Sequence, residues 1–231
     1  MTIIRSRANP SFSCTCKPRV EFGKCTNLDH PLKLEWLAST YRQYVECWAL
    51  GKYTLKKHDI TKNKMSGESH RLKYGQLIYD YKWSNSESVK DRSIPEIFRS
   101  VKYFIDGYFP KNLREFNATL PIPPTSTKAR TIPFEVSKKL EKYSLKNCQE
   151  LIDVTNKKIS PSKDLKTKPE KIENLEGKFI IGDSSYLNGV TGILVIDDVY
   201  EQGATAEVIL QVINKIAPDL PKYFLSIAYL D

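Results

Sequence analysis

The sequence predicts an α/β fold, a parallel sheet of about five strands flanked by helices, with a helical and loop-rich N-terminal half. Three observations favour this fold. Short apolar runs of strand type recur in the second half of the chain, and apolar faces of helical spacing lie between them. One of these runs, residues 193–196, is followed by two adjacent carboxylates, a glycine turn and a further helix. Strands that alternate with helices form parallel sheets, and ligands of such sheets bind at the carboxyl ends of the strands.

The composition fits one globular domain with an appendage. The 231 residues are 40% hydrophobic, which is enough for a sizeable core. The formal net charge of +9 favours anionic partners. The sequence has no arginine-rich block and no aromatic stripe interleaved with basic residues, so nucleic acid stays an open partner class without a specific signal. The oligomeric state stays open as well.

Nothing in the sequence indicates export or membrane insertion. Residues 1–14 have no apolar core of signal-peptide length, and no segment is apolar over the length of a membrane span. Five cysteines, an odd number, argue against a disulfide framework. We therefore expect a cytoplasmic protein without a membrane partner.

Three regions differ in composition, and each is a candidate domain. Residues 1–31 are a polar, cysteine-containing N-terminal module, residues 32–111 a mainly helical region, and residues 112–231 the α/β core. Apolar residues at spacings of three and four predict an amphipathic helix over 34–50, ended by Gly51, and a second helix over 94–108.

The core region shows strand and helix patterns in alternation. Strands are expected over 118–122, 150–154, 178–181, 193–196 and 223–229. Helices are expected over 133–143, with Pro133 in the first turn, and over 208–216, before Pro218. Residues 156–171 are polar and lysine-rich, and we interpret them as a long mobile loop.

The most informative stretch is 192–205, which reads GILVIDDVYEQGAT. Asp197 and Asp198 can accept hydrogen bonds from vicinal hydroxyls and can hold a magnesium ion through water. Gly203 can adopt a positive φ, which lets backbone N–H groups face an anion, and Thr205 adds a hydroxyl donor where the helix starts. A solvated strand end is the plainer interpretation, but the combination favours a ligand with both hydroxyls and phosphate, such as a ribose phosphate.

Four segments together resemble one family. Residues 192–205 resemble the signature by which type I phosphoribosyltransferases bind phosphoribosyl pyrophosphate (PRPP): an apolar strand, Asp-Asp, a short turn ending in Thr-Gly-x-Thr, and a helix. Residues 120–134 (LPIPPTSTKARTIPF), 171–181 (KIENLEGKFII) and 75–83 (GQLIYDYKW) are similar to segments of the ComF-type, competence-associated branch of that family. The resemblance covers roughly residues 70–231 and implies a hood over the site from the region 32–111.

The resemblance implies a role for each matching position. PRPP would be bound by the segment after the strand, namely Asp197, Asp198, Val199, Tyr200, Glu201, Gln202, Gly203, Ala204 and Thr205. The pyrophosphate loop would be Pro123, Pro124, Thr125 and Ser126. Asp197 and Asp198 would also hold magnesium, Arg130 and Lys163 would neutralise the leaving pyrophosphate, and residues 156–171 would be a lid.

The implied reaction is displacement of pyrophosphate by a nitrogen base at the anomeric carbon of PRPP. Such chemistry needs electrostatic stabilisation and exclusion of water more than a strong protein base. The sequence departs from the family at Glu201 and Gln202, where hydroxyl side chains are usual. The alternative is therefore a catalytically silent protein of ComF type that binds PRPP or nucleotides in DNA uptake, repair or regulation.

A possible zinc site lies at the N-terminus. Cys14, Cys16, Cys25 and His30 have the spacing C-x-C-x8-C-x4-H, and three thiolates with one imidazole are a suitable tetrahedral set for structural zinc. ComF-type proteins often carry an N-terminal four-cysteine module, although its knuckle is usually C-x-x-C. Cys47 is an alternative fourth ligand, and free thiols are the alternative to any metal site.

Overall fold

The computed structural model describes residues 7–8, 32–37, 44–54, 71–107, 116–125, 131–161 and 164–230. Of the cysteine-containing module, residues 1–31, only residues 7–8 are described, so the proposed zinc ligands Cys14, Cys16, Cys25 and His30 lie outside the described residues. The chain forms two compact units. Unit 1 consists of Met1–Tyr108, Asp198–Glu201 and Leu225–Asp231, and unit 2 of Phe109–Asp197 and Gln202–Phe224.

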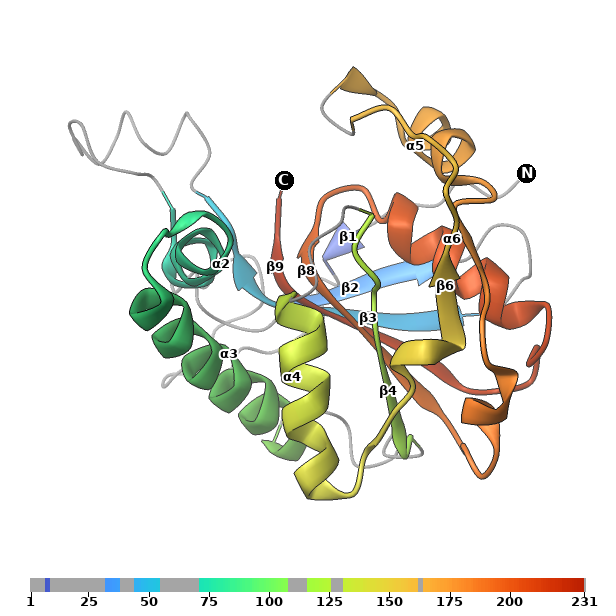
Figure 1. The fold of residues 1–231 in the computed structure, drawn as a ribbon, viewed down its shortest axis with the longest axis horizontal. Coiled ribbons are helices and arrows are strands. Elements are labelled where there is room, and N and C mark those ends of the chain that lie inside the picture. Colours follow the sequence, from blue (N-terminus) through green and yellow to red (C-terminus); the bar gives the residue numbers. More distant parts are fainter. Residues whose placement is uncertain are drawn as a thin grey trace. The chain divides into compact units, whose positions relative to one another are not determined.

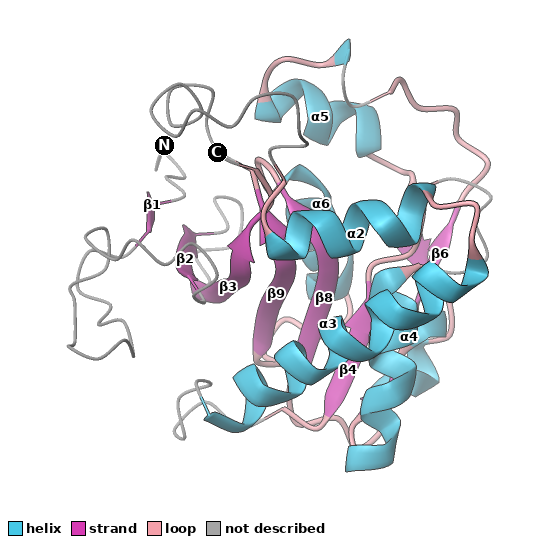
Figure 2. Ribbon diagram, turned by 90° about the vertical axis from the view of Figure 1, so that its left-hand side faces the viewer, coloured by secondary structure: helices cyan, strands magenta, loops and turns pink. Residues whose placement is uncertain are grey.

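Strands and helices alternate through most of the described residues (Figures 1 and 2). The strands are β1 (Arg7–Ala8), β2 (Leu32–Leu37), β3 (Tyr44–Lys52), β4 (Ala118–Pro121), β5 (Lys146–Asn147), β6 (Ile152–Val154), β7 (Phe179–Ile181), β8 (Ile193–Tyr200) and β9 (Lys222–Tyr229). The helices are α2 (Lys73–Trp83), α3 (Glu87–Gly107), α4 (Ile132–Leu140), α5 (Lys168–Leu175) and α6 (Ala204–Asn214). None of the described helices is both long and apolar enough to cross a membrane.

The main sheet has the strand order β1-β2-β3-β9-β8-β4-β5. The five strands β3, β9, β8, β4 and β5 run parallel, which confirms the predicted α/β fold. Backbone bonds join the starts of β8 and β9, from Ile193 N–H to Pro221 O, and the ends of β3 and β9, from Tyr53 N–H to Tyr229 O. Strands β1 and β2 extend the β3 edge in antiparallel register.

The helix predicted over 34–50 is wrong, because this stretch forms the antiparallel strands β2 and β3. Cys47, Trp48, Ala49 and Leu50 are all at most 1% exposed, so consecutive side chains on both faces of β3 are buried. An inner strand of this kind has no alternation of apolar and polar residues, and its apolar positions also satisfy a helical spacing. Gly51, expected to end a helix, lies inside β3.

The other predicted elements form close to their expected positions in the sequence, but two of the predicted strands belong to a different sheet than expected. The strands predicted over 150–154 and 178–181 become β6 and β7, which pair antiparallel in a separate two-stranded sheet. Their backbone bonds continue from Gly182 N–H to Leu151 O and from Thr155 N–H to Lys178 O. The parallel sheet therefore takes its remaining strands from β3 and the short β5.

In unit 1, α2 and α3 lie side by side and both contact β3 (Figure 1). The buried face of α3 includes Ile97, Val101 and Phe104. The rings of Trp48 on β3 and Phe104 pack at a tilt, with centroids 5.3 Å apart. Both side chains are almost completely buried, so this aromatic pair is part of the apolar core of unit 1.

Helix α2 approaches the end of β3 very closely at Gly75. Leu72 N–H donates a hydrogen bond to the carbonyl oxygen of Tyr53 at 3.0 Å. A Cβ atom on residue 75 would lie 1.9 Å from the same oxygen. The glycine is therefore required by the approach of two backbones rather than by an unusual backbone conformation.

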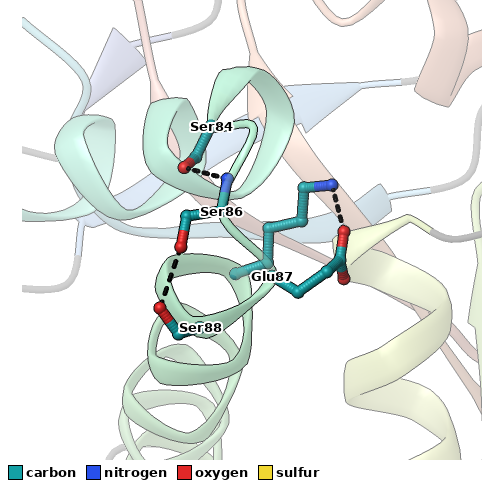
Figure 3. Close-up of polar contacts among 5 residues, drawn as sticks. Ser84, Ser86, Glu87 and Ser88 are labelled. Atoms are coloured by element: carbon teal, nitrogen blue, oxygen red, sulfur yellow. Dashed lines mark hydrogen bonds and ion pairs between the residues drawn. The ribbon is translucent and has the colours of Figure 1, made fainter.

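Polar contacts among serines hold the junction between α2 and α3 (Figure 3). Ser84 follows α2, and its Oγ accepts a hydrogen bond from Ser86 N–H at 3.0 Å. The hydroxyl oxygens of Ser86 and Ser88 lie 2.8 Å apart, and Lys90 Nζ donates to Glu87 Oε1 at 2.7 Å. Glu87 also lies in the first turn of α3, where a carboxylate interacts favourably with the helix dipole.

In unit 2, α4 packs against β4, and its start has the signals expected from sequence. Thr131 is the N-cap, with its Oγ1 accepting from Phe134 N–H at 3.4 Å, and Pro133 lies in the first turn. Leu120 of β4 and Ile132 and Leu140 of α4 are completely buried. The core of unit 2 is thus built around the strand that leads into the predicted pyrophosphate loop.

Two buried groups in unit 2, Lys222 and Cys148, are expected to change the free energy of unfolding with pH in opposite directions. Burial lowers the pKa of Lys222 to about 8, although its Nζ donates to the carbonyl oxygens of Ala217, Pro218 and Leu220. Above that pH the unfolded chain binds more protons at Lys222 than the folded protein does, so stability rises up to about pH 10. Burial raises the pKa of Cys148 to about 11, so its contribution falls as pH rises from about 8.5 to 11.

Urea denaturation of Cys148→Ala between about pH 7.5 and 10 separates these contributions. Between these two pH values we expect the free energy of unfolding of Cys148→Ala to rise by about 1–3 kcal/mol more than that of Cys148→Ala/Lys222→Met, which lacks the titrating lysine. Parallel curves for the two variants would contradict the assignment to Lys222.

Candidate functional site

The chain from β8 to α6 forms the strand, turn and helix that the sequence predicts. Ile193–Ile196 are completely buried, whereas Asp197 and Asp198 are half-buried at the point where the strand leaves the core. After Tyr200, a turn leads to Gly203, which has φ 73° and ψ 15° and is the N-cap of α6. The left-handed conformation is one that glycine adopts without strain.

The first turn of α6 presents backbone donors to the turn before it. The first intrahelical bond runs from Glu207 N–H to Gly203 O at 2.9 Å. The N–H groups of the preceding helical residues, Ala204, Thr205 and Ala206, have no acceptor within the helix, and Gly203 has no side chain to cap them. This geometry suits an anion, since the helix dipole also favours negative charge there.

The predicted pyrophosphate loop follows β4 at the same edge of the sheet in unit 2. Pro121 is the register partner of Ile196, and Ile122 N–H donates to Ile196 O at 2.9 Å. Ile122 therefore follows β4 at the level where Asp197 follows the buried part of β8, and Pro123 comes next. Pro123 and Pro124 are half-buried and Thr125 is exposed. Ser126 and Arg130 lie outside the described residues.

Asp198 forms an ion pair that the sequence did not predict. Lys82 Nζ, from the last turn of α2, lies 2.7 Å from Asp198 Oδ2, and both residues belong to unit 1. The side chains are 33% and 18% exposed, so the pair is partly shielded from water. One of the two predicted ribose-binding carboxylates thus already has an ammonium group beside it.

The lysine-rich stretch lies against the start of α6 in unit 2. Lys168 Nζ lies 2.7 Å from Glu207 Oε2, and Glu207 is only 3% exposed. Gln202 Nε2 donates to the Lys166 carbonyl oxygen at 3.4 Å, while the other amide atom, Oε1, is buried without a hydrogen-bond partner among the described residues. Lys166 therefore lies beside Gln202 of the predicted phosphate turn, and Lys168 lies beside the first turn of α6 at Glu207.

The prediction of one long loop over 156–171 is only partly correct. Helix α5 begins at Lys168 with a capping box, in which Thr167 Oγ1 accepts from Glu170 N–H and Glu170 Oε2 accepts from Thr167 N–H. Asn174 of α5 forms two hydrogen bonds with the backbone of Ser160. The described part of the stretch is therefore attached to α5, and Lys163 lies outside it.

The remaining predicted residues occupy different environments. Tyr200 is buried, Glu201 is exposed, and Val199 and Thr205 are half-buried. An exposed Glu201 can direct its carboxylate to solvent, which reduces its repulsion of an anion at the turn. The sequence predicts no role for Lys82 or Glu207, because their partners are far away along the chain. The signal for Glu207 was a lone acidic residue on the otherwise apolar helix pattern 204–214.

The two carboxylates fit magnesium only together with a ligand. No group of three His, Cys, Asp or Glu side chains in the described residues could hold a metal ion. Magnesium is usually held by one or two carboxylates, water and the phosphates of a substrate. Asp197 and Asp198 therefore suit a metal that arrives with a polyphosphate ligand and that the carboxylates hold through water.

Comparison of the chain with models of known protein families and with curated protein sequences finds no match.

Proposed function

We propose that this protein binds PRPP as its magnesium complex and transfers phosphoribose to a nitrogen base or nucleotide-related acceptor. The observation that carries the proposal is the segment 197–205, in which two half-buried carboxylates in the second half of β8 precede an uncapped helix start at Gly203. The carboxylates can accept from ribose hydroxyls, and the backbone N–H groups of Ala204 and Thr205 can donate to the 5-phosphate. The type I phosphoribosyltransferase resemblance supports the same assignment.

In the proposed reaction, the bond between the anomeric carbon and the pyrophosphate oxygen breaks and pyrophosphate leaves with the electron pair. The acceptor nitrogen forms the new bond to that carbon and loses its proton to water or to the leaving group. Pro123–Ser126 would hold the pyrophosphate, and Arg130 and Lys163 would neutralise its charge. Closure of residues around Lys166 over the turn would exclude water.

A second candidate function is binding without transfer, in DNA uptake, repair or regulation as proposed for ComF-type proteins. Glu201 and Gln202 favour it, because neither supplies the hydroxyl donor that family members place before the glycine. The Nε2 of Gln202 donates to Lys166 O rather than standing ready for a phosphate. Pyrophosphate release in the presence of a panel of bases distinguishes transfer from binding alone.

The proposal predicts PRPP binding that depends on the acidic pair. Calorimetric titration with PRPP and magnesium is expected to show saturable binding to the wild-type protein. In Asp197→Asn/Asp198→Asn we expect binding to weaken at least about a hundredfold, because two charge-assisted hydrogen bonds are lost. Asp91→Asn/Glu173→Gln removes two exposed carboxylates elsewhere and is the matched control. Equal affinity of the double Asn variant and the wild type would contradict the assignment.

A further inference from the structure

Lys82 lies at the end of a helix that packs closely within unit 1. Helix α2 buries Tyr74, Ile78 and Tyr81, and its first turn is in backbone contact with β3 through Gly75. The last turn of the helix, which carries Lys82, therefore has a fixed place within the unit. Its ammonium group lies 2.7 Å from Asp198 Oδ2, in the range of a strong charge-assisted hydrogen bond.

An ammonium group that is bound to one carboxylate oxygen limits rotation of the carboxylate but does not fill all of its hydrogen-bond acceptor sites. An ionised carboxylate has about four acceptor sites on its two oxygens. Lys82 occupies part of this capacity, at Oδ2 of Asp198, and a single ammonium group cannot fill all of these sites. The ion pair also limits rotation of the side chain, which lowers the entropy cost of binding a ligand hydroxyl.

The same contact makes Asp198 a poorer ligand for a divalent cation. A cation on this carboxylate would lie close to the positive charge of Lys82, and two like charges at such a separation repel strongly in a partly shielded site. Hydroxyl groups carry no net charge and experience no such repulsion. Asp198 is thus better suited to sugar hydroxyls than to direct coordination of magnesium.

We propose that Lys82 is a positioning residue of the PRPP site, which holds the Asp198 carboxylate in the orientation that accepts a hydrogen bond from a ribose hydroxyl. This inference rests on the proposed function. It assigns a role in sugar recognition to α2. It also predicts that the difference in affinity between ribose and deoxyribose ligands depends on Lys82. Lys82 lies in the sequence segment GQLIYDYKW, but its ion pair with Asp198 can be identified only from the structure.

The test compares three probes by calorimetry: ribose 5-phosphate and its 2-deoxy and 3-deoxy analogues. The wild-type protein is expected to bind ribose 5-phosphate about tenfold more tightly than the deoxy analogue that lacks the hydroxyl bound by Asp198. Without that hydroxyl, the carboxylate loses its hydrogen-bond donor in the site. In Lys82→Met we expect ribose 5-phosphate to bind about tenfold more weakly and this discrimination to disappear. Lys82→Arg is expected to restore most of both.

Lys73→Met is the matched control, since Lys73 lies on the same helix and pairs with Glu96 at 3.4 Å in an exposed position. It should bind all three probes as the wild type does. A purely structural role for Lys82 would change the melting temperature of Lys82→Met but keep the discrimination between ribose and deoxyribose, and this result would overturn the inference. If Lys82→Met does not fold, Lys82→Gln provides the same comparison.

The failures of the two proposals are distinguishable. Loss of PRPP binding in Asp197→Asn/Asp198→Asn, together with unchanged discrimination in Lys82→Met, overturns the role of Lys82 and leaves the proposed function intact. A wild-type protein that binds neither PRPP nor ribose 5-phosphate overturns both. Discrimination that depends on Lys82 in a protein that releases no pyrophosphate supports the role of Lys82 and favours binding without transfer.

Discussion

Replacing Gly75 with alanine is expected to lower the free energy of unfolding by about 3 kcal/mol, although alanine is normally preferred over glycine in a helix by about 1 kcal/mol. The sign reverses because the new Cβ would lie 1.9 Å from the Tyr53 carbonyl oxygen, a backbone atom that cannot rotate away. Helix α2 would have to move off β3, and the bond from Leu72 N–H to the same oxygen would be lost. Urea denaturation of the variant measures the effect.

Gly177→Ala is the control for this prediction. Gly177 has a φ of 70°, but nothing lies within 4 Å of a Cβ built there. Its substitution is therefore expected to cost only the strain of a left-handed alanine, about 1–2 kcal/mol. A Gly75→Ala protein as stable as the wild type would show that α2 and β3 do not approach as closely as described.

The second large effect is expected at the ion pair between α5 and α6. Lys168→Ala should lower the free energy of unfolding by about 3 kcal/mol, because it leaves the buried Glu207 carboxylate without the ammonium group at 2.7 Å. Replacing both residues, as in Lys168→Met/Glu207→Gln, should recover much of the loss, since no charge then remains buried. Thermal and urea denaturation of Lys168→Met, Glu207→Gln and Lys168→Met/Glu207→Gln, measured beside the wild type, form the required cycle.

Lys166→Ala is the matched control, since this lysine is exposed and contributes its backbone oxygen rather than its side chain to the contact with Gln202. It is expected to change the stability by less than about 0.5 kcal/mol. Additive effects of the Lys168 and Glu207 substitutions would show that the two charges do not depend on each other.

The sequence predicted those parts of the fold that have local signals. The start of α4 is specified by Thr131 and Pro133, and the helix after Gly203 by its apolar face. Strand β3 was misassigned because burial on both faces removes the alternation that identifies a strand. The pairing of β6 with β7 was missed because an apolar run of three residues carries no signal for the sheet in which it lies.

The candidate site was predictable only as far as its residues are neighbours in the sequence. Asp197, Asp198 and Gly203 lie in one short stretch, and Gly203 precedes a helix as expected, but β8 is longer than predicted and includes both aspartates. The contacts of Lys82 with Asp198 and of Lys168 with Glu207 join positions far apart in the chain. Charge alone could not select them, because the sequence has 36 lysines and arginines and 27 acidic residues.

Two buried cysteines among the described residues provide chemical reporters for the two units. Cys47 belongs to unit 1 and Cys148 to unit 2, and both are thiols outside any disulfide with no exposed surface. A thiol-alkylating reagent reaches such a group only when the surrounding structure opens, so the alkylation rate of each reports the local opening equilibrium of its own unit. Mass spectrometry of peptides after pulses of reagent can therefore resolve whether a PRPP-type ligand protects one unit or both, without any engineered label.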